Sequence, residues 1–222
     1  MVTTGAETNI RLVAHAAFPQ QAAAQRVIKR ALDLVVTLPA LLFLSPLFLL
    51  IAVWIKLDAR GPVFFRQVRV GRNGLNFRIF KFRTMVTDAE QRGAQLTVGA
   101  DQRITRSGHF LRRYKFDELP QFINVLLGEM TLVGPRPEVP RYVAHYAEHE
   151  RAILALTPGI TSPASLEFRS ESELLAQQSD PEQFYLAEVM PAKIRTDLAY
   201  ARQANWRSDL GVLAQTVLRI LR

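Results

Sequence analysis

An uncharged apolar segment of 22 residues, from Leu34 to Ile55, constrains the fold of this chain more than any other feature. Folded as a helix, it would extend about 33 Å, which is enough to cross the hydrocarbon core of a bilayer. Ser45 and Pro46 lie near its middle. A proline inside a helix removes one backbone hydrogen bond and clashes with the preceding turn, so we expect a bend at Ser45-Pro46. We also expect the Ser45 hydroxyl to bond a carbonyl that the bend leaves free.

Basic residues flank this segment on both sides. They are Arg26, Lys29 and Arg30 before it, and Lys56, Arg60, Arg66, Arg69 and Arg72 after it. A helix that crosses a bilayer carries its excess of lysine and arginine on the cytoplasmic side, so two basic flanks favour a re-entrant helix that returns to the same face. A membrane-spanning helix is the open alternative. A buried core helix and a signal peptide are disfavoured by the length of the run and by the polar stretch before it.

The overall charge points to anionic partners. The chain has 222 residues and a formal net charge of +8. Beside an apolar helix, that charge favours lipid headgroups or a phosphate-rich substrate, with nucleic acid as the competing explanation. The chain has no cysteine, which excludes disulfides and thiolate metal sites. Together these features predict an N-terminal lead-in over 1–25, a re-entrant membrane helix over 26–57 and a domain on the membrane surface over 58–222.

The remaining patterns predict an α/β fold that is mainly α. Strands over 63–70 and 76–85 flank Gly71-Arg72-Asn73-Gly74, which is a hairpin turn signal. Alternation along the second strand places Lys81 and Arg83 on one face. Ser107 could cap a short helix over 107–114, and further helical patterns follow over residues 117–128, 138–156, 170–178, 181–204 and 208–222. The last of these is amphipathic, with Leu210, Leu213, Val217, Ile220 and Leu221 on one stripe. It suits equally a helix packed on the domain core and one that lies in the membrane interface.

Two adjacent carboxylates, Asp117 and Glu118, stand at a predicted helix start. Unpaired backbone N–H groups and the helix dipole favour the ionised form of an aspartate there. One carboxylate could attack a phosphorus atom while the other holds Mg²⁺, which prefers carboxylate and phosphate oxygens. Taken alone, however, acidic residues in a first helical turn are more often ordinary helix caps.

Several basic residues could complete a diphosphate site around this pair. Lys81 and Arg83 share a strand face, Arg112 lies one short helix upstream, and Arg136 stands between two prolines that restrict its backbone. A single surface arginine is usually solvated and has no binding role. Arg136, whose backbone two prolines restrict, fits that alternative least well. Asp197 is a further candidate within a helical segment. Phosphate-binding glycine loops and the GxSxG nucleophile motif are missing from the sequence.

The ordered set of motifs resembles the bacterial sugar transferase family, the monotopic phosphoglycosyl transferases. The motifs are Lys29-Arg30, the apolar run with Ser45-Pro46, Lys81-Phe82-Arg83-Thr84-Met85, Asp117-Glu118-Leu119-Pro120-Gln121, Gly134-Pro135-Arg136-Pro137 and Pro158-Gly159-Ile160-Thr161. The resemblance covers roughly residues 26–205. It implies transfer of a phospho-sugar from a UDP-sugar to polyprenyl (undecaprenyl) phosphate with release of UMP, as the first membrane step of glycoconjugate or polysaccharide assembly. Residues 162–169 depart from many members, so the resemblance leaves the sugar unassigned.

The resemblance also implies roles for individual residues. Asp117 would be the nucleophile that forms an aspartyl phospho-sugar, and Glu118 would bind Mg²⁺. Arg112 and Arg136 match positions linked to substrate phosphates, while Lys81 and, more loosely, Asp197 match active-site positions. Residues 58–222 would then be a catalytic domain on the cytoplasmic face of the bacterial inner membrane. Membrane lipids are expected partners, a homodimer is plausible and nucleic acid is not expected.

Two other hypotheses stay open at this point. A membrane-tethered protein that binds anionic lipid or nucleic acid would explain the charge and the apolar segment, but not a carboxylate pair among phosphate-binding arginines. Alternatively, an enzyme of the same class could use Asp117 as a base on the lipid phosphate, without a covalent step.

Overall fold

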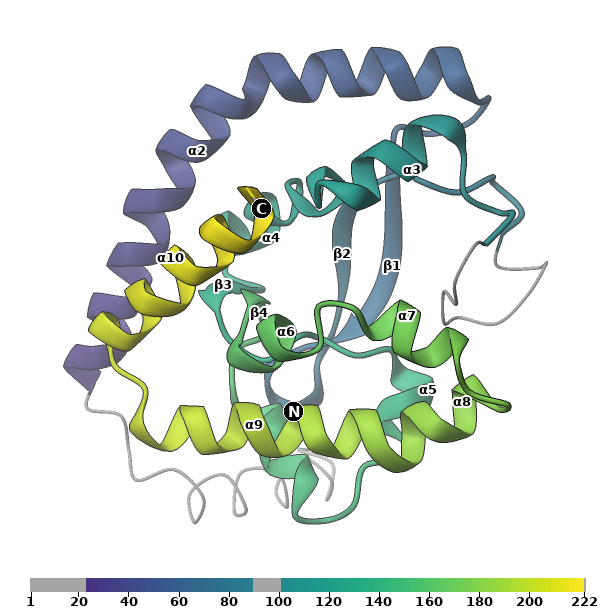
Figure 1. Cartoon of the computed structure of the whole chain (residues 1–222). Coiled ribbons are helices and arrows are strands. Elements are labelled where there is room, and N and C mark those ends of the chain that lie inside the picture. The colour runs from purple at the N-terminus through teal and green to yellow at the C-terminus, as the bar shows by residue number, and fades with distance from the viewer. Residues whose placement is uncertain (1–22, 90–100, 222) are drawn as a thin grey trace, which may run out of the picture.

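The computed structural model describes residues 23–89 and 101–221, and it is mainly helical with two small sheets (Figure 1). One long helix, α2 (Ala23–Asp58), arches around a more compact body that the rest of the described chain forms. The expected α/β class with a helical majority is thus confirmed. Residues 1–22 of the predicted lead-in lie outside the described residues.

The other elements follow α2 in chain order. The first half contains β1 (Phe64–Val70), η1 (Arg72–Gly74), β2 (Asn76–Phe82), α3 (Arg106–Arg113), η2 (Phe116–Glu118), α4 (Gln121–Leu127), β3 (Thr131–Val133) and α5 (Pro140–Val143). The second half contains η3 (Glu150–Ala155), β4 (Gly159–Thr161), α6 (Pro163–Glu167), α7 (Glu171–Ala176), α8 (Pro181–Phe184), η4 (Tyr185–Val189), α9 (Met190–Gln203) and α10 (Trp206–Leu221). The helix expected over 138–156 is therefore two short pieces, α5 and η3, and the helix over 181–204 includes a π-helical turn at η4.

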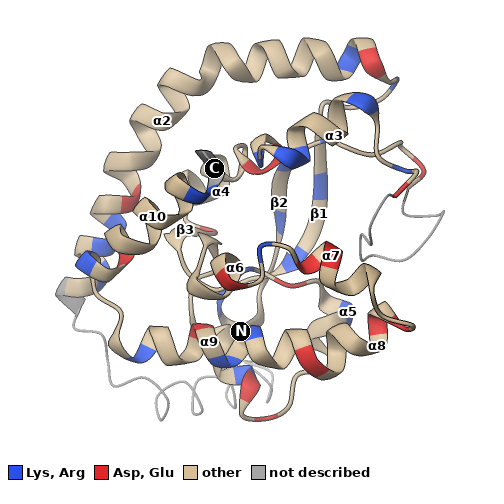
Figure 2. Ribbon diagram, in the orientation of Figure 1, with Lys and Arg blue, Asp and Glu red and all other residues tan. Residues whose placement is uncertain are grey.

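The apolar segment forms one helix that bends partway along its length (Figure 1). Pro46 has no N–H to donate to the carbonyl of Leu42, and the Ser45 hydroxyl donates to that carbonyl instead, over 2.7 Å. This confirms the expected role of Ser45. A second proline inside the helix, Pro39, did not enter the sequence prediction. Large apolar side chains point outward here, and that of Phe43 is 79% exposed. Charged residues on α2 lie only toward its two ends (Figure 2).

The N-terminal arm of α2 is tied to the body by charged side chains. Asp33 is buried, and it accepts hydrogen bonds from the Thr131 hydroxyl over 2.7 Å and the Leu132 N–H over 3.0 Å. Lys29 donates to the carbonyl of Val133 over 2.8 Å, and Arg30 donates to carbonyls at the end of α4. Asp33 thus has the partners that a buried carboxylate requires, and they lie on β3.

The C-terminal end of α2 is tied to the same body. Asp58 accepts from the N–H and the hydroxyl of Ser107 over 2.9 and 2.8 Å. Arg83 donates to the carbonyls of Ala59, over 2.6 Å, and Arg60. The predicted strand face shared by Lys81 and Arg83 is wrong, because β2 ends at Phe82 and the alternation stops there. Arg83 caps the end of α2 and does not reach the carboxylate pair.

Two sheets hold the body together. β1 and β2 form the predicted antiparallel hairpin, with Phe64 opposite Phe82 and Asn73 and Gly74 at positive φ in the turn. β3 and β4 form a parallel pair that the sequence did not predict. The turns beside this pair touch so closely that a Cβ on Gly159 would lie 2.1 Å from the Gly134 nitrogen. Only glycine fits at these two positions.

α10 packs on the body through one face. Val212 is buried, and the Thr216 and Thr161 hydroxyls lie 2.8 Å apart. Of the predicted stripe, Leu213 packs against the same buried group as Val212, whereas Leu210 and Val217 are about half exposed. The structure therefore supports core packing by an adjacent face, while Leu210 and Val217 stay outside it.

Replacing Asp33 by alanine should weaken the attachment of α2. It leaves the Leu132 N–H and the Thr131 hydroxyl buried without an acceptor, which costs about 1–3 kcal/mol per unsatisfied group. We expect the midpoint of thermal unfolding in detergent to fall by several degrees. Glu148→Ala, which removes an exposed carboxylate, is the control. Equal midpoints for the two variants would contradict the anchoring role of Asp33.

Candidate active site

The segment that carries Asp117 is positioned by α3. The Thr105 hydroxyl caps α3 by accepting from the Gly108 N–H over 3.0 Å, so the cap is Thr105 and not Ser107 as the sequence suggested. Lys115 adopts a left-handed conformation with φ 59°, which ends the helical run and turns the chain into η2.

The sequence predicted that Asp117 caps the next helix, but the structure shows that it does not. α4 begins at Gln121, with Pro120 at the N-cap position and no side-chain cap bond. The Asp117 side chain is buried, and its Oδ1 atom has no hydrogen-bond partner. A buried carboxylate oxygen without a partner is costly. Ordinary helix capping therefore does not explain this residue.

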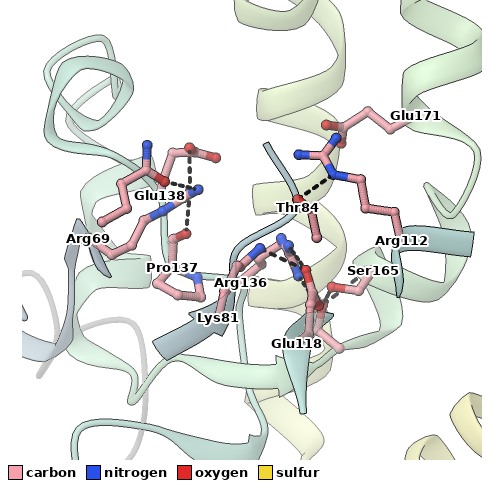
Figure 3. A network of polar contacts seen from close by, with 12 residues as sticks. Arg69, Lys81, Thr84, Arg112, Glu118, Arg136, Pro137, Glu138, Ser165 and Glu171 are labelled. Carbon is pink, nitrogen blue, oxygen red and sulfur yellow. Dashed lines mark hydrogen bonds and ion pairs between the residues drawn. The ribbon is translucent and has the colours of Figure 1, made fainter. Parts of the chain in front are cut away.

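Glu118 is held by two cationic side chains (Figure 3). Lys81 donates to Oε1 over 2.9 Å, and Arg136 donates to Oε1 and, over 3.0 Å, to Oε2. Burial alone would raise the pKa of Glu118, but the charges of Arg136 and Lys81 outweigh it and hold that pKa well below the ordinary value. The Glu118 charge in turn raises the pKa of Arg136. Glu118 is therefore an anion fixed in place by a bidentate arginine.

Asp117 has the opposite electrostatic character. Burial raises its pKa, and the adjacent charge of Glu118 raises it further. Lys81, Arg112 and Lys115 act against this shift without cancelling it. Two neighbouring carboxylates thus differ in behaviour, as is common for pairs that divide two chemical roles.

A second layer of contacts holds the loop that carries Arg136 (Figure 3). Arg69 donates to the Pro137 carbonyl over 3.0 Å and to Glu138 over 3.3 Å. The Tyr185 hydroxyl donates to the other oxygen of Glu138 over 2.6 Å. Sequence reasoning missed Arg69, Glu138 and Tyr185 in this role. Glu138 follows the Pro-Arg-Pro motif directly, and that position is the one signal that could have drawn attention to it.

Asn124 connects α4 to the β-hairpin, and Arg112 connects α3 to the segment that follows the hairpin. Asn124 is buried on α4, where it accepts from the Phe80 N–H over 2.8 Å and donates to the Arg78 carbonyl over 3.0 Å. This docks α4 on β2 and brings Glu118 within reach of Lys81. Arg112 Nε donates to the Thr84 hydroxyl over 3.0 Å. The structure therefore gathers Lys81, Arg112, Arg136 and the two carboxylates, as predicted, and leaves out Arg83.

Asp197 links two helices of the body and lies apart from the carboxylate pair in its contacts. It is buried on α9, and its Oδ1 accepts from the Ala164 N–H at the start of α6 over 3.1 Å. Burial raises the pKa of Asp197 to about 6, against the hydrogen bonds from Ala164 and Ser162. These contacts fix α6 on α9, and the contacts that the structure gives Asp197 do not include Asp117 or Glu118.

Asp117 and Glu118 are the residues of this site that could hold a metal ion. Within residues 23–89 and 101–221, no group of three or more histidine, aspartate or glutamate side chains could hold a metal ion. Asp117 Oδ1 has no partner, and Glu118 Oε2 accepts one hydrogen bond. Mg²⁺ is often bound by one or two carboxylates together with substrate phosphates and water. Either of these oxygens could serve as such a ligand.

Replacing Asp197 by asparagine should change how stability depends on pH. The pKa of Asp197 is raised in the folded state to about 6, from 3.8, so the buried carboxyl is neutral and carries no penalty below about pH 4, and stability is lost progressively as the pH rises to 6. Asparagine keeps an acceptor for Ala164 without a charge. We expect Asp197→Asn to be more stable than the unaltered protein at pH 7, by up to about 3 kcal/mol in the free energy of unfolding. Its midpoint of thermal unfolding should rise accordingly.

At pH 4 the difference between Asp197→Asn and the unaltered protein should nearly vanish. Asp180→Asn, an exposed change at a helix cap that asparagine also serves, is the matched control. Unfolding midpoints of Asp197→Asn that run parallel to those of the unaltered protein between pH 4 and pH 7 would contradict this assignment.

Comparisons with known proteins identify a family and several relatives of this chain. The family model described as bacterial sugar transferase matches residues 24–222. An undecaprenyl-phosphate glucose phosphotransferase of Komagataeibacter xylinus is 40% identical over 198 residues, which cover 86% of this chain and 35% of that relative. A UDP-N-acetylgalactosamine-undecaprenyl-phosphate N-acetylgalactosaminephosphotransferase of Aeromonas hydrophila is 49% identical over 119 residues, which cover 54% of this chain and 28% of the relative.

A relative of similar length gives a fuller match. The exopolysaccharide production protein PSS of Rhizobium leguminosarum bv. phaseoli is 38% identical over 208 residues, which cover 86% of this chain and 94% of that protein. By contrast, the chain spans about two fifths or less of the two phosphotransferases described above. The family match extends over nearly all of the chain, from α2 to α10, and the chain belongs to the bacterial sugar transferase family.

Proposed function

We propose that this protein transfers a sugar 1-phosphate from a UDP-sugar to polyprenyl phosphate, such as undecaprenyl phosphate, and releases UMP. The names of the relatives support the reaction class, because two of them are undecaprenyl-phosphate sugar phosphotransferases. One observation in the structure carries the proposal. Asp117 is buried with an unpaired oxygen, beside a second carboxylate that Lys81 and Arg136 already occupy. A membrane-tethered binding protein would not require that arrangement.

In the first step, Asp117 attacks the phosphorus that carries the sugar. A bond forms between a carboxylate oxygen and this phosphorus, and the bond to the bridging oxygen of UMP breaks. UMP departs with the bonding electron pair, and an aspartyl phospho-sugar remains on the enzyme. Asp117 must be ionised to attack. Since burial raises its pKa, the positive charges of Lys81 and Arg112 serve both to ionise it and to attract the diphosphate.

In the second step, a phosphate oxygen of polyprenyl phosphate attacks the same phosphorus. The bond between phosphorus and Asp117 breaks, the carboxylate is restored, and the sugar leaves on a polyprenyl diphosphate. The covalent intermediate lets one site serve a water-soluble donor and a membrane-embedded acceptor in turn. A direct transfer, with Asp117 as a base on the lipid phosphate, is the competing mechanism.

We propose that Glu118 holds Mg²⁺ through Oε2 when the donor binds, which leaves Asp117 Oδ1 for the attack. The ion would supply positive charge to the departing phosphate oxygens of UMP. Arg136 and Lys81 keep Glu118 ionised and oriented for this role. They also limit Glu118 as a nucleophile, since both of its oxygens accept hydrogen bonds.

We further propose that α2 is re-entrant, and that residues 58–222 lie as a catalytic domain on the cytoplasmic face of the inner membrane. Asp33 near one end of α2 and Asp58 at the other bind the same body, while the bend between them carries exposed apolar side chains. A helix fixed at both ends to one domain enters a bilayer most simply at its bend. The basic residues on both flanks support the same orientation.

Replacing Asp117 by asparagine tests the reaction. Detergent-solubilised protein is given Mg²⁺, undecaprenyl phosphate and a panel of UDP-sugars, and UMP is measured. We expect UMP release with one or a few donors, and a loss of at least about a thousandfold in Asp117→Asn, because the amide is not a nucleophile. Asp180→Asn, on the exposed surface, should keep full activity. A sugar-phosphate adduct trapped on Asp117 would separate the covalent from the direct mechanism, and UMP release by Asp117→Asn would contradict both.

Single cysteines test the course of α2. The chain has no cysteine, so Gln25→Cys, Phe43→Cys and Arg60→Cys each create one reactive thiol. A re-entrant helix predicts that a membrane-impermeant maleimide labels positions 25 and 60 in inverted vesicles and neither in intact spheroplasts. Position 43, at the exposed apolar part of α2, should resist labelling from both sides. Labelling of position 25 or 60 from outside would show that α2 spans the membrane.

A further inference from the structure

An exposed aromatic cluster joins the C-terminal arm of α2 to α3. Trp54 of α2 and Phe110 of α3 have ring centroids 5.3 Å apart, and Phe110 and Tyr114 are 4.8 Å apart. The three residues are 40%, 43% and 39% exposed, respectively. Contacts between aromatic rings usually bury most of their surface. We call these residues, Trp54, Phe110 and Tyr114, the aromatic cluster.

The aromatic cluster continues the exposed apolar side of α2. Leu50, Val53 and Leu57 on the same arm are 68%, 50% and 82% exposed. The opposite side of this arm packs inward, where Ile55 and Leu111 are buried in one apolar group. α3 thus lies against the arm of α2 (Figure 1), and the exposed rings of Phe110 and Tyr114 add to the apolar surface. An exposed apolar surface of this kind marks an interaction site.

Residues 113–117 connect the aromatic cluster to Asp117, the proposed nucleophile. The guanidinium carbon of Arg113 lies 5.7 Å from the Tyr114 ring centroid, and Lys115 beside it is exposed. The Phe116 ring is 6.0 Å from that of Tyr114, and Asp117 is the next residue. Aromatic rings, two exposed cations and the buried carboxylate are thus gathered within residues 110–117. This combination suits an amphiphile that has an apolar tail and an anionic phosphate.

We propose that the aromatic cluster is the subsite for the first isoprene units of the polyprenyl phosphate acceptor. The rings would contact the branched, unsaturated chain where it leaves the bilayer, and Arg113 and Lys115 would receive its phosphate on the way to Asp117. This inference rests on the proposed function, because it names the acceptor of the same site. The competing role is an aromatic belt that sets the depth of the protein in the membrane interface without binding the acceptor.

The two tryptophans of the chain provide a matched test. Trp206 on α10 is 43% exposed, close to the 40% of Trp54, and is not part of the cluster. Trp54→Leu and Phe110→Leu keep an apolar side chain but remove a ring, and Trp206→Leu does the same elsewhere. In detergent, we expect the first two to raise the KM for undecaprenyl phosphate about fivefold to tenfold and Trp206→Leu to leave it unchanged.

The donor half of the reaction separates acceptor binding from general damage. Exchange of labelled UMP into the UDP-sugar requires the covalent step but not the acceptor. We expect exchange rates in Trp54→Leu and Phe110→Leu to match those of the unaltered protein. An unchanged acceptor KM in both variants, or an equal rise in Trp206→Leu, would overturn the proposal. So would weaker partition onto phosphatidylglycerol vesicles with no change of acceptor KM in detergent, which is the result for an aromatic belt.

A binding measurement keeps the subsite testable if the proposed function fails. In Trp206→Leu, Trp54 is the one remaining tryptophan of the chain, so its fluorescence reports on the cluster alone. Undecaprenyl phosphate in detergent should change that fluorescence saturably, and inorganic phosphate should not. Absence of UMP exchange in the unaltered protein would count against the proposed function, whereas absence of a saturable change would count against the subsite.

Discussion

The attachment of both ends of one apolar helix to the same body determines how the rest of this protein is arranged. Asp33 binds β3 near the start of α2, and Arg83 and Asp58 bind its end. Both attachments use hydrogen bonds between charged groups and buried backbone or hydroxyl partners, which are costly to break inside a protein. The exposed apolar bend therefore points away from the body, and the body is held at a fixed distance from whatever the bend enters. Since α3 packs under the second arm of α2, the segment that carries Asp117 follows a helix on the side of the body that faces this arm.

The two carboxylates of the candidate site differ because their neighbours differ. Glu118 accepts three hydrogen bonds from Lys81 and Arg136, so its charge is compensated and its oxygens are largely occupied. Asp117 is buried, its Oδ1 has no partner, and its pKa is raised. A nucleophile needs a lone pair that can reach the substrate. An anion that only supplies charge needs instead to be held in place by hydrogen bonds. These contacts support the proposed attack by Asp117 and the proposed supporting role of Glu118.

Local chemistry explains which features the sequence could predict. The bend at Ser45-Pro46, the turn at Asn73-Gly74 and the restricted Arg136 depend on the residues themselves and their neighbours, and all three were predictable. The parallel pairing of β3 with β4 joins short strands far apart in the chain, and three-residue strands carry no periodic signal. Arg83 was misplaced because alternation holds only while a strand continues, and β2 ends one residue earlier. Thr105 replaced Ser107 as the cap because Ser107 binds Asp58 on α2, which is a tertiary contact.

The contacts of Arg69, Glu138 and Tyr185 around the Arg136 loop explain the role of a buried ionic network that adds little stability. Arg69 and Glu138 lose solvation on burial, and pairs of this kind often contribute little net stability. Their contacts act instead on geometry. Arg69 holds the Pro137 carbonyl, Tyr185 holds Glu138, and the Gly134–Gly159 contact holds the other side of the loop. Arg136 is thereby placed on Glu118 before any substrate arrives. A charge that is already oriented needs no reorganisation when a diphosphate binds, and that pre-organisation is the main way in which a site of fixed cations lowers a barrier to phosphoryl transfer.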